Sequence, residues 1–156
     1  MIILGIDPGT AATGYGVIKK ARALKCLDCG VIRTSPSQTA AERLKIINNT
    51  LSKIIKFQQP EILAMEKVFF AKNLKTALLV SQAEGVILLT AAKKKIPVYQ
   101  FTPMEIKMTI TGYGWAKKER VKKKIEKLLN LEEISKSDDA IDALAAALTY
   151  LIKHKI

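Results

Sequence analysis

The sequence contains one histidine, two cysteines and no apolar stretch long enough to span a membrane. With His154 as its single histidine, near the C-terminal end, a histidine general base or a Ser-His-Asp triad is not expected. The nucleotide-binding pattern G-x-x-x-x-G-K-[ST] is absent. The longest apolar run covers residues 86–92, whereas a membrane helix needs ~18 residues or more. No basic segment precedes the apolar N-terminus, as it would in a signal peptide. We therefore expect a cytoplasmic protein that uses neither a membrane nor a nucleotide.

The two cysteines, Cys26 and Cys29, form one C-x-x-C pair. A structural zinc site needs more ligands than one such pair supplies. No helix-start pattern follows the pair, as a thioredoxin-type redox motif would require. We interpret both residues as reduced thiols in a strand, with a metal or redox role as the alternative.

Acidic residues are scarce relative to basic ones. The chain has 14 Asp and Glu against 26 Lys and Arg, which gives a net charge of +12. A domain this basic typically binds a polyanion, although a basic surface can also serve solubility alone. Much of the excess lies in residues 117–127, and this clustering favours a nucleic-acid partner.

Hydrophobic periodicity and turn residues divide the chain into strands and helices without a linker or repeat. Strands are predicted at residues 2–6, 14–18, 24–33, 61–65 and 96–101. Helices are predicted at residues 39–59, 72–93 and 117–129, with two more starting at residues 102 and 137. This order indicates an α/β protein, a single domain over residues 1–156 with a mixed five-stranded sheet and helices on both faces.

Four carboxylates are placed where they could converge. Asp7 and Glu66 each follow an apolar strand, and ligands gather at the carboxyl ends of parallel strands. Asp139 and Asp142 are three apart on a helix, so they share one face. Converging carboxylates raise one another's pKa unless a cation neutralises them. Hard oxygen ligands suit Mg²⁺ or Mn²⁺, and two such ions can hydrolyse a phosphodiester.

Each carboxylate taken singly also has a structural interpretation. Asp7 precedes Pro-Gly and could begin a turn. Asp139 could favour the positive end of a helix dipole. Glu66 could form a solvated ion pair with Lys67, although it directly follows the apolar run of residues 62–65.

Several blocks of sequence together resemble one family. The opening Leu4-Gly5-Ile6-Asp7-Pro8-Gly9-Thr10 and Thr13-Gly14-Tyr15-Gly16-Val17-Ile18 are similar to the start of RuvC, the bacterial Holliday junction resolvase. The same holds for residues 65–73 (MEKVFFAKN), 82–86 (QAEGV) and 139–145 (DAIDALA). The opening block alone is weak, because actin-like ATPases also bind phosphate with a D-x-G-T turn. The blocks in this order and at these separations are highly specific and cover nearly the whole chain.

The resemblance implies a ribonuclease H-like fold and a homodimer that binds four-way DNA junctions. Such an enzyme nicks two strands of like polarity symmetrically during recombination and repair, and leaves ligatable nicks with 5′-phosphates. A branch-migration motor is an implied partner. The resemblance implies two Mg²⁺ per subunit, for which Mn²⁺ can substitute, and the family's metal ligands map onto Asp7, Glu66, Asp139 and Asp142.

The resemblance also assigns residues outside the metal ligands. Phe69 is expected to stack on a base at the opened junction centre. Lys107 and Lys118 match basic residues near the scissile phosphate, and Lys118 is expected to assist catalysis. Lys117 and Lys122 extend this basic surface toward DNA. The helix at residues 72–93 corresponds to the family's dimer interface.

Some points stay open at this stage. Asp138 and Asp142 are four apart and also share a helix face, but the family's D-x-x-D pattern favours Asp139. Trp115 replaces an expected small residue, and either covers DNA or packs locally. The chain ends at Ile156, without the longer tail common in bacterial members. The alternative functions are a less selective branched-DNA nuclease, a junction-binding protein without catalysis, and an actin-like ATPase.

Overall fold

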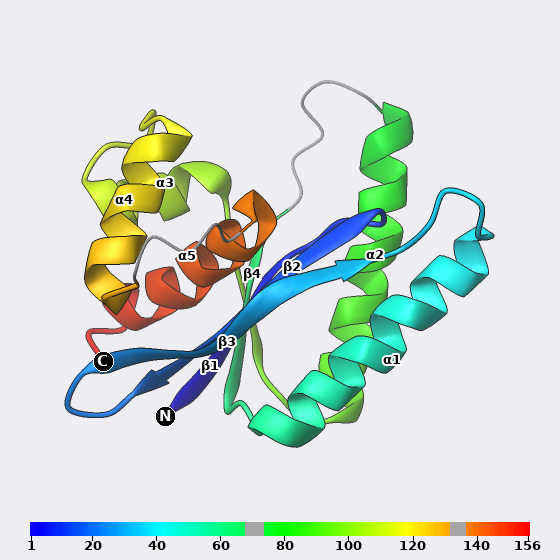
Figure 1. The fold of residues 1–156 in the computed structure, drawn as a ribbon, viewed down its shortest axis with the longest axis horizontal. Coiled ribbons are helices and arrows are strands. Elements are labelled where there is room, and N and C mark those ends of the chain that lie inside the picture. Colours follow the sequence, from blue (N-terminus) through cyan, green and yellow to red (C-terminus); the bar gives the residue numbers. More distant parts are fainter. Residues whose placement is uncertain (68–73, 132–136) are drawn as a thin grey trace.

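The computed structural model describes residues 1–67, 74–131 and 137–156, so the predicted Phe69 lies outside the described residues. The described elements are β1 (Ile2–Asp7), β2 (Ala12–Lys20), β3 (Leu24–Arg33), α1 (Ala40–Gln58), β4 (Ile62–Glu66), α2 (Leu74–Lys93), β5 (Val98–Phe101), α3 (Pro103–Thr111), α4 (Lys118–Leu129) and α5 (Asp138–Lys153). Figure 1 shows their arrangement. Within these ranges no helix is long and apolar enough to cross a membrane.

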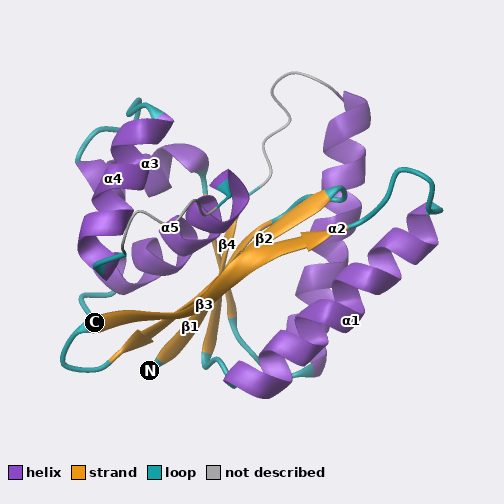
Figure 2. Cartoon of the chain, in the orientation of Figure 1, coloured by secondary structure: helices purple, strands orange, loops and turns teal. Residues whose placement is uncertain are grey.

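The strands form one mixed sheet in the order β3-β2-β1-β4-β5. β1, β2 and β3 are an antiparallel meander, whereas β4 is parallel to β1 and β5 is parallel to β4. Figure 2 shows the sheet crossing the molecule between two groups of helices. The predicted five-stranded mixed sheet is therefore confirmed, and β4 returns beside β1 as a right-handed crossover allows.

Alternate residues of each strand point into two different cores, one on each face of the sheet. Ile3 belongs to the core beneath α3, α4 and α5, and the next residue, Leu4, belongs to the core beneath α1 and α2. Both side chains are fully buried. Burying a side chain of this size contributes ~1.5–3 kcal/mol. This alternation explains why helices cover both faces of the sheet (Figure 1).

Helix α5 lies directly on β1 and β2 because glycines leave room for it. A Cβ built on Gly5 of β1 would lie 1.9 Å from the carbonyl oxygen of Ala143, and one built on Gly14 of β2 would lie 2.0 Å from the carbonyl oxygen of Asp139. No side chain fits at such a distance from backbone. The two glycines therefore set the height of α5 above the sheet.

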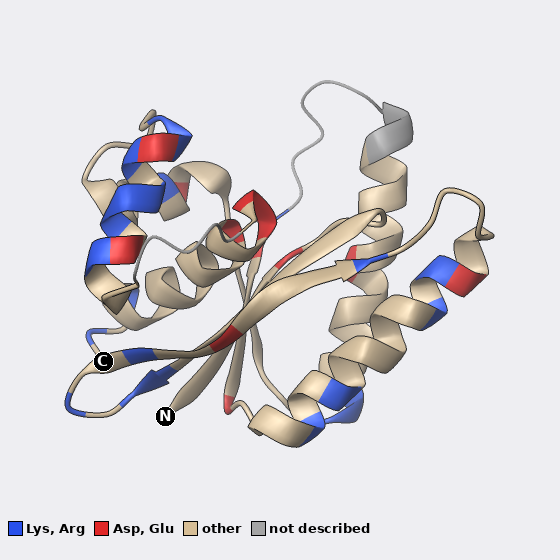
Figure 3. Cartoon of the chain, in the orientation of Figure 1, with Lys and Arg blue, Asp and Glu red and all other residues tan. Residues whose placement is uncertain are grey.

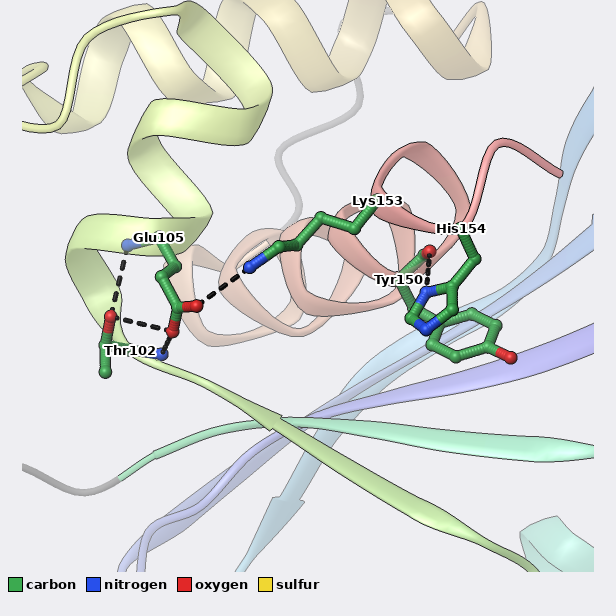
Figure 4. A network of polar contacts seen from close by, with 5 residues as sticks. All are labelled: Thr102, Glu105, Tyr150, Lys153 and His154. Atoms are coloured by element: carbon green, nitrogen blue, oxygen red, sulfur yellow. Dashed lines mark hydrogen bonds and ion pairs between the residues drawn. The ribbon is translucent and has the colours of Figure 1, made fainter.

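The start of α3 is tied to the end of α5, as Figure 4 shows. Thr102 and Glu105 form a capping box, and Lys153 Nζ donates to Glu105 Oε1 over 2.8 Å. The hydrogen bond from Lys153 has the largest effect on the pKa of Glu105. Together with the hydrogen bonds from Thr102, it lowers this pKa to about 2. His154 stacks on Tyr150 with ring centroids 4.2 Å apart. The Lys153–Glu105 ion pair therefore joins α3 to α5, whereas the Tyr150–His154 stack lies within the C-terminal end of α5.

Candidate active site

Asp7 and Glu66 end two adjacent parallel strands at the same edge of the sheet. Ile6 of β1 pairs with Met65 of β4, so the residues that follow them lie side by side. Both carboxyl-bearing residues are only partly exposed. The sheet topology therefore brings together Asp7 and Glu66, although they are far apart in the sequence.

Helix α5 brings Asp139 and Asp142 to the same place. Ser137 caps its N-terminus, with Oγ accepting from the backbone N–H of Ala140 at 3.3 Å. Gly14 is the register partner of Asp7, and the Cβ built on it would lie 3.1 Å from Cβ of Asp139. The first turn of α5 therefore lies over the end of β1, where Asp7 is found.

The carboxylates influence one another's ionisation. Burial, followed by the charges of Glu66, Asp142 and Asp139, raises the pKa of Asp7 to about 8. Burial and then the charge of Asp142 raise the pKa of Glu66 to about 7. Burial also raises the pKa of Asp142. Raised values of this kind mark a cluster of negative charge that lacks enough positive charge for its neutralisation.

Two lysines lie among these carboxylates. Lys118 Nζ lies 3.2 Å from Oδ2 of Asp142. Although partial burial opposes it, the Asp142 carboxylate raises the pKa of Lys118. The charges of Lys118 and then of Lys107 partly offset the rise in the pKa of Glu66. A cleft of about 170 Å³, which we call the carboxylate cleft, is lined by Glu66, Pro103, Ile106, Lys107, Lys118, Val121 and Asp142.

The donor set fits a divalent cation by its chemistry. Four carboxylates offer only hard oxygen ligands, which Mg²⁺ and Mn²⁺ prefer. Burial first, and then the neighbouring carboxylates, raise the pKa of Asp7 and of Glu66, so a bound cation would favour their ionised forms. As the side chains stand, no three acidic, histidine or cysteine side chains of the described residues converge on one point. Binding an ion therefore requires the carboxylates to close in.

The structure distinguishes Asp139 from Asp138. Asp138 is exposed, whereas Asp139 is partly buried. Asp139 raises the pKa of Asp7, while Asp138 acts on Lys118 and Asp142. Asp138 lines a second cleft of about 180 Å³ that also includes Lys122. The geometry therefore favours Asp139 as the residue that faces the strand ends.

The remaining predicted residues lie apart from the carboxylates. Lys117 does not line the carboxylate cleft. It lines a larger groove of about 540 Å³ with Thr111, Glu119, Arg120, Lys123, Lys124 and Lys127. Figure 3 shows how basic residues gather on α4. Because this groove contains no pair of carboxylates, we place the chemistry in the smaller cleft.

Cys26 and Cys29 lie in β3, as predicted, and pack against the core beneath α5.

Sequence reasoning missed the part that Gly5 and Gly14 play in placing α5. A signal was present, since a glycine inside a strand often marks the close approach of another backbone. It also missed the groove between α3 and α4, where Arg120 Nη2 donates to the carbonyl oxygen of Thr111 at 3.3 Å. The residues of this groove recur along one face of α4, which the sequence does indicate. That α3 lies beside this face is seen only in the structure.

Comparison with known proteins gives consistent matches along the whole chain. The profile of the family described as crossover junction endodeoxyribonuclease RuvC matches residues 3–150. The RuvC of Natranaerobius thermophilus is 46% identical over 157 residues, covering 100% of this chain and 98% of that protein. The RuvC of Caldicellulosiruptor saccharolyticus is 44% identical over 154 residues, covering 97% and 93%. The structure of T. thermophilus RuvC in complex with Holliday junction substrate has a TM-score of 0.93 and 34% identity, covering 99% of this chain and 95% of that one. The shared architecture is the ribonuclease H-like fold.

Proposed function

The chain belongs to the RuvC family of crossover junction endodeoxyribonucleases and is a Holliday junction resolvase; at the level of residues, we propose that Asp7, Glu66, Asp139 and Asp142 hold its catalytic metal ions. The family is metal-dependent, and we propose two Mg²⁺ per subunit, with Mn²⁺ as a substitute. The observation that carries this proposal is the position of Asp7 and Glu66 at adjoining strand ends, with the first turn of α5 and Asp139 packed over the end of β1.

The protein's own residues would perform the following tasks. The carboxylates hold the ions at the edge of the sheet, and the ions when bound activate water and stabilise the leaving oxygen. Lys118 presents its ammonium group beside Asp142, where it can donate to a phosphate oxygen. Lys107, which also lines the carboxylate cleft, would fix the neighbouring phosphate. The product is a nick with a 5′-phosphate.

We propose that the basic residues of α4 bind two parts of the DNA backbone. Lys118 and Lys122 line the clefts on the carboxylate side, and Lys117 lines the groove on the other side. Phosphate contacts of this kind supply affinity and make it depend on salt. The base-stacking role of Phe69 rests on the family resemblance alone.

A homodimer matches the symmetry of the substrate. A four-way junction with two equivalent strands suits an isologous dimer with one site per strand. Helix α2 exposes Leu78, Leu79 and Leu89, and an apolar face of this kind suits a subunit interface. We therefore propose that α2 pairs with its counterpart in a second copy.

Residues 1–156 would act as a single nuclease domain, because the site draws on residues from 7 to 142. Action on chromosomal DNA implies a cytoplasmic location, with a branch-migration motor as a possible partner.

Cleavage of a labelled synthetic four-way junction tests this function. The junction and a linear duplex of the same sequence are incubated with Mg²⁺, Mn²⁺ or EDTA. Symmetric nicks in the junction alone, and only with metal, support the proposal. Binding without nicks supports a non-catalytic junction-binding protein. Equal cutting of flaps, forks and junctions supports a less selective nuclease.

A further inference from the structure

Four large apolar side chains are exposed on α3 and on the loop that connects α3 to α4. Trp115 is 73% exposed, and Met104, Met108 and Tyr113 are each about half exposed. The loop rests on the helix, because a Cβ built on Gly114 would lie 2.9 Å from Cγ of Met104. We call Met104, Met108, Tyr113 and Trp115 the loop patch. Single exposed apolar residues are common, but a group within one short segment marks a contact site.

Local hydrogen bonds hold this loop in one shape. Gly112 ends α3 with a φ of 75°, in the left-handed region. The Oγ1 atom of Thr111 accepts from the backbone N–H of Tyr113 at 3.2 Å. Ala116 is 3% exposed, and its N–H donates to the carbonyl oxygen of Tyr113 at 3.1 Å. Because an ordered loop presents the exposed indole, contact with a ligand costs little conformational entropy.

Direct sequence neighbours of the loop patch line the carboxylate cleft, since Pro103 precedes Met104 and Lys107 precedes Met108. Trp115 is three residues before Lys118, whose Nζ lies 3.2 Å from Asp142 Oδ2. Three residues span at most ~11 Å even when fully extended, so the two Cα atoms lie within that distance. On α3, Lys107 lines the cleft and is one turn from Met104. A DNA strand whose phosphate contacts Lys118 therefore passes within reach of the indole.

The chemistry around the loop patch favours a nucleotide over a protein. The charged residues nearest in sequence to its aromatic pair are the cations Lys117 and Lys118. A nucleotide offers a flat π-face together with a negative phosphate, which matches an exposed indole beside ammonium groups. Lys117 extends the same positive charge into the groove on the far side of α4.

We propose that Trp115 contacts DNA and stacks on a junction base next to the scissile phosphate. This inference rests on the proposed function, since it requires a junction bound at the carboxylate cleft. Removing an aromatic ring that stacks on a base weakens affinity by ~5- to 150-fold. A junction offers bases that are unstacked at its crossover, whereas an intact duplex does not.

The fluorescence of Trp115 provides a direct test, because it is the only tryptophan in the sequence. The chain is titrated in EDTA with a four-way junction or with a linear duplex of the same sequence. Anisotropy of a dye on the DNA measures binding independently of the tryptophan. We expect junction saturation to quench the emission and to protect the indole from acrylamide, with a much smaller change for the saturated duplex. Unchanged emission at saturation, or equal changes with both DNAs, would overturn the proposal.

Variants give a second measurement. Trp115→Ala should weaken junction binding ~5- to 150-fold, and Trp115→Phe should retain most of the affinity because it keeps a ring. Phe57→Ala is the matched control, since Phe57 is 85% exposed on the distant helix α1 and should bind as wild type does. Thermal unfolding checks that all three variants are folded.

The outcomes separate this inference from the proposed function. If the wild-type chain neither binds nor cuts the junction with Mg²⁺, the proposed function fails and this inference fails with it. If the wild type binds and cuts while Trp115→Ala binds equally tightly, only the role of Trp115 is refuted. Loss of binding in both Trp115→Ala and Phe57→Ala would also refute it, because the effect would not be specific to the loop patch.

Discussion

Replacing Asp7 with asparagine should stabilise the metal-free chain, measured in EDTA. The same substitution should abolish cutting of the junction when Mg²⁺ is present. The pKa of Asp7 is raised from 3.8 to about 8, and each pKa unit corresponds to ~1.4 kcal/mol of folding free energy. Full ionisation of Asp7 in the folded chain therefore costs at most ~5–6 kcal/mol. Because Asp7 is partly exposed to water, the cost is smaller than this limit, and we expect at least ~2 kcal/mol. Asparagine has nearly the same shape and carries no charge.

The pH dependence of this effect has a definite sign. In the unfolded chain Asp7 loses its proton near pH 4, whereas the folded chain keeps that proton until about pH 8. Native stability therefore falls as pH rises through this window and then levels off. The difference between Asp7→Asn and wild type should accordingly be small at pH 4 and largest above pH 8. Glu66, with a pKa of about 7, keeps a similar dependence in both proteins.

Thermal unfolding in EDTA between pH 4 and 9 measures this effect. A gain of ~2 kcal/mol corresponds to a Tm rise of ~4–8 °C for a chain of this size. Glu105→Gln is a control of opposite sign, because the pKa of Glu105 is lowered to about 2 and its ion pair is lost in the variant. Junction affinity should be kept or increased in Asp7→Asn. A variant no more stable than wild type at high pH would refute the reasoning, and lost affinity with unfolding would show Asp7 to be structural.

Three further predictions concern the packing, the interface and the basic surface. Gly14→Ala should destabilise the chain by ~1–3 kcal/mol and reduce cutting more than binding, because its Cβ would meet the Asp139 carbonyl at 2.0 Å; wild-type cutting by a folded variant would contradict this. Leu78→Asp, on the exposed face of α2, should shift a dimer to monomer in analytical ultracentrifugation, and an unchanged sedimentation coefficient would reject this interface. Lys118→Ala should slow cutting and reduce the salt dependence of junction binding by about one phosphate contact; an affinity that does not respond to salt in the wild type would contradict the electrostatic argument.

The positions of Asp7 and Glu66 could be predicted because they depend on local signals. Each follows a short apolar run, and parallel neighbours bring their carboxyl ends to one edge of a sheet. The register then leaves little freedom, since Ile6 and Met65 are direct partners. The basic helix and the five-stranded sheet were likewise predictable from periodicity and turn residues. The elements themselves are set by residues close together in the chain, and the order of the strands then follows from the rules of sheet topology.

Other features of the site required the tertiary structure. The choice between Asp138 and Asp139 depends on which side chain faces the strand ends, and both have suitable helical spacing. Lys117 and Lys118 are adjacent in sequence but line different clefts, because Lys117 is the N-cap with extended backbone and Lys118 is the first residue of α4. The exposure of Trp115 could not be deduced from its neighbours, since an indole in a loop can equally fill a core.

The packing of α5 on the sheet connects stability with function. Gly5 and Gly14 allow the helix backbone to approach two strands, and this approach brings Asp139 and Asp142 over Asp7 and Glu66. A larger residue at either glycine would hold the helix farther away and let the carboxylates separate. The cluster would then be easier to ionise, but it would bind a cation less well. The raised pKa of Asp7 is therefore a consequence of the same close packing that gathers the proposed metal ligands, and substitutions that relieve the repulsion should also weaken the binding of the ions.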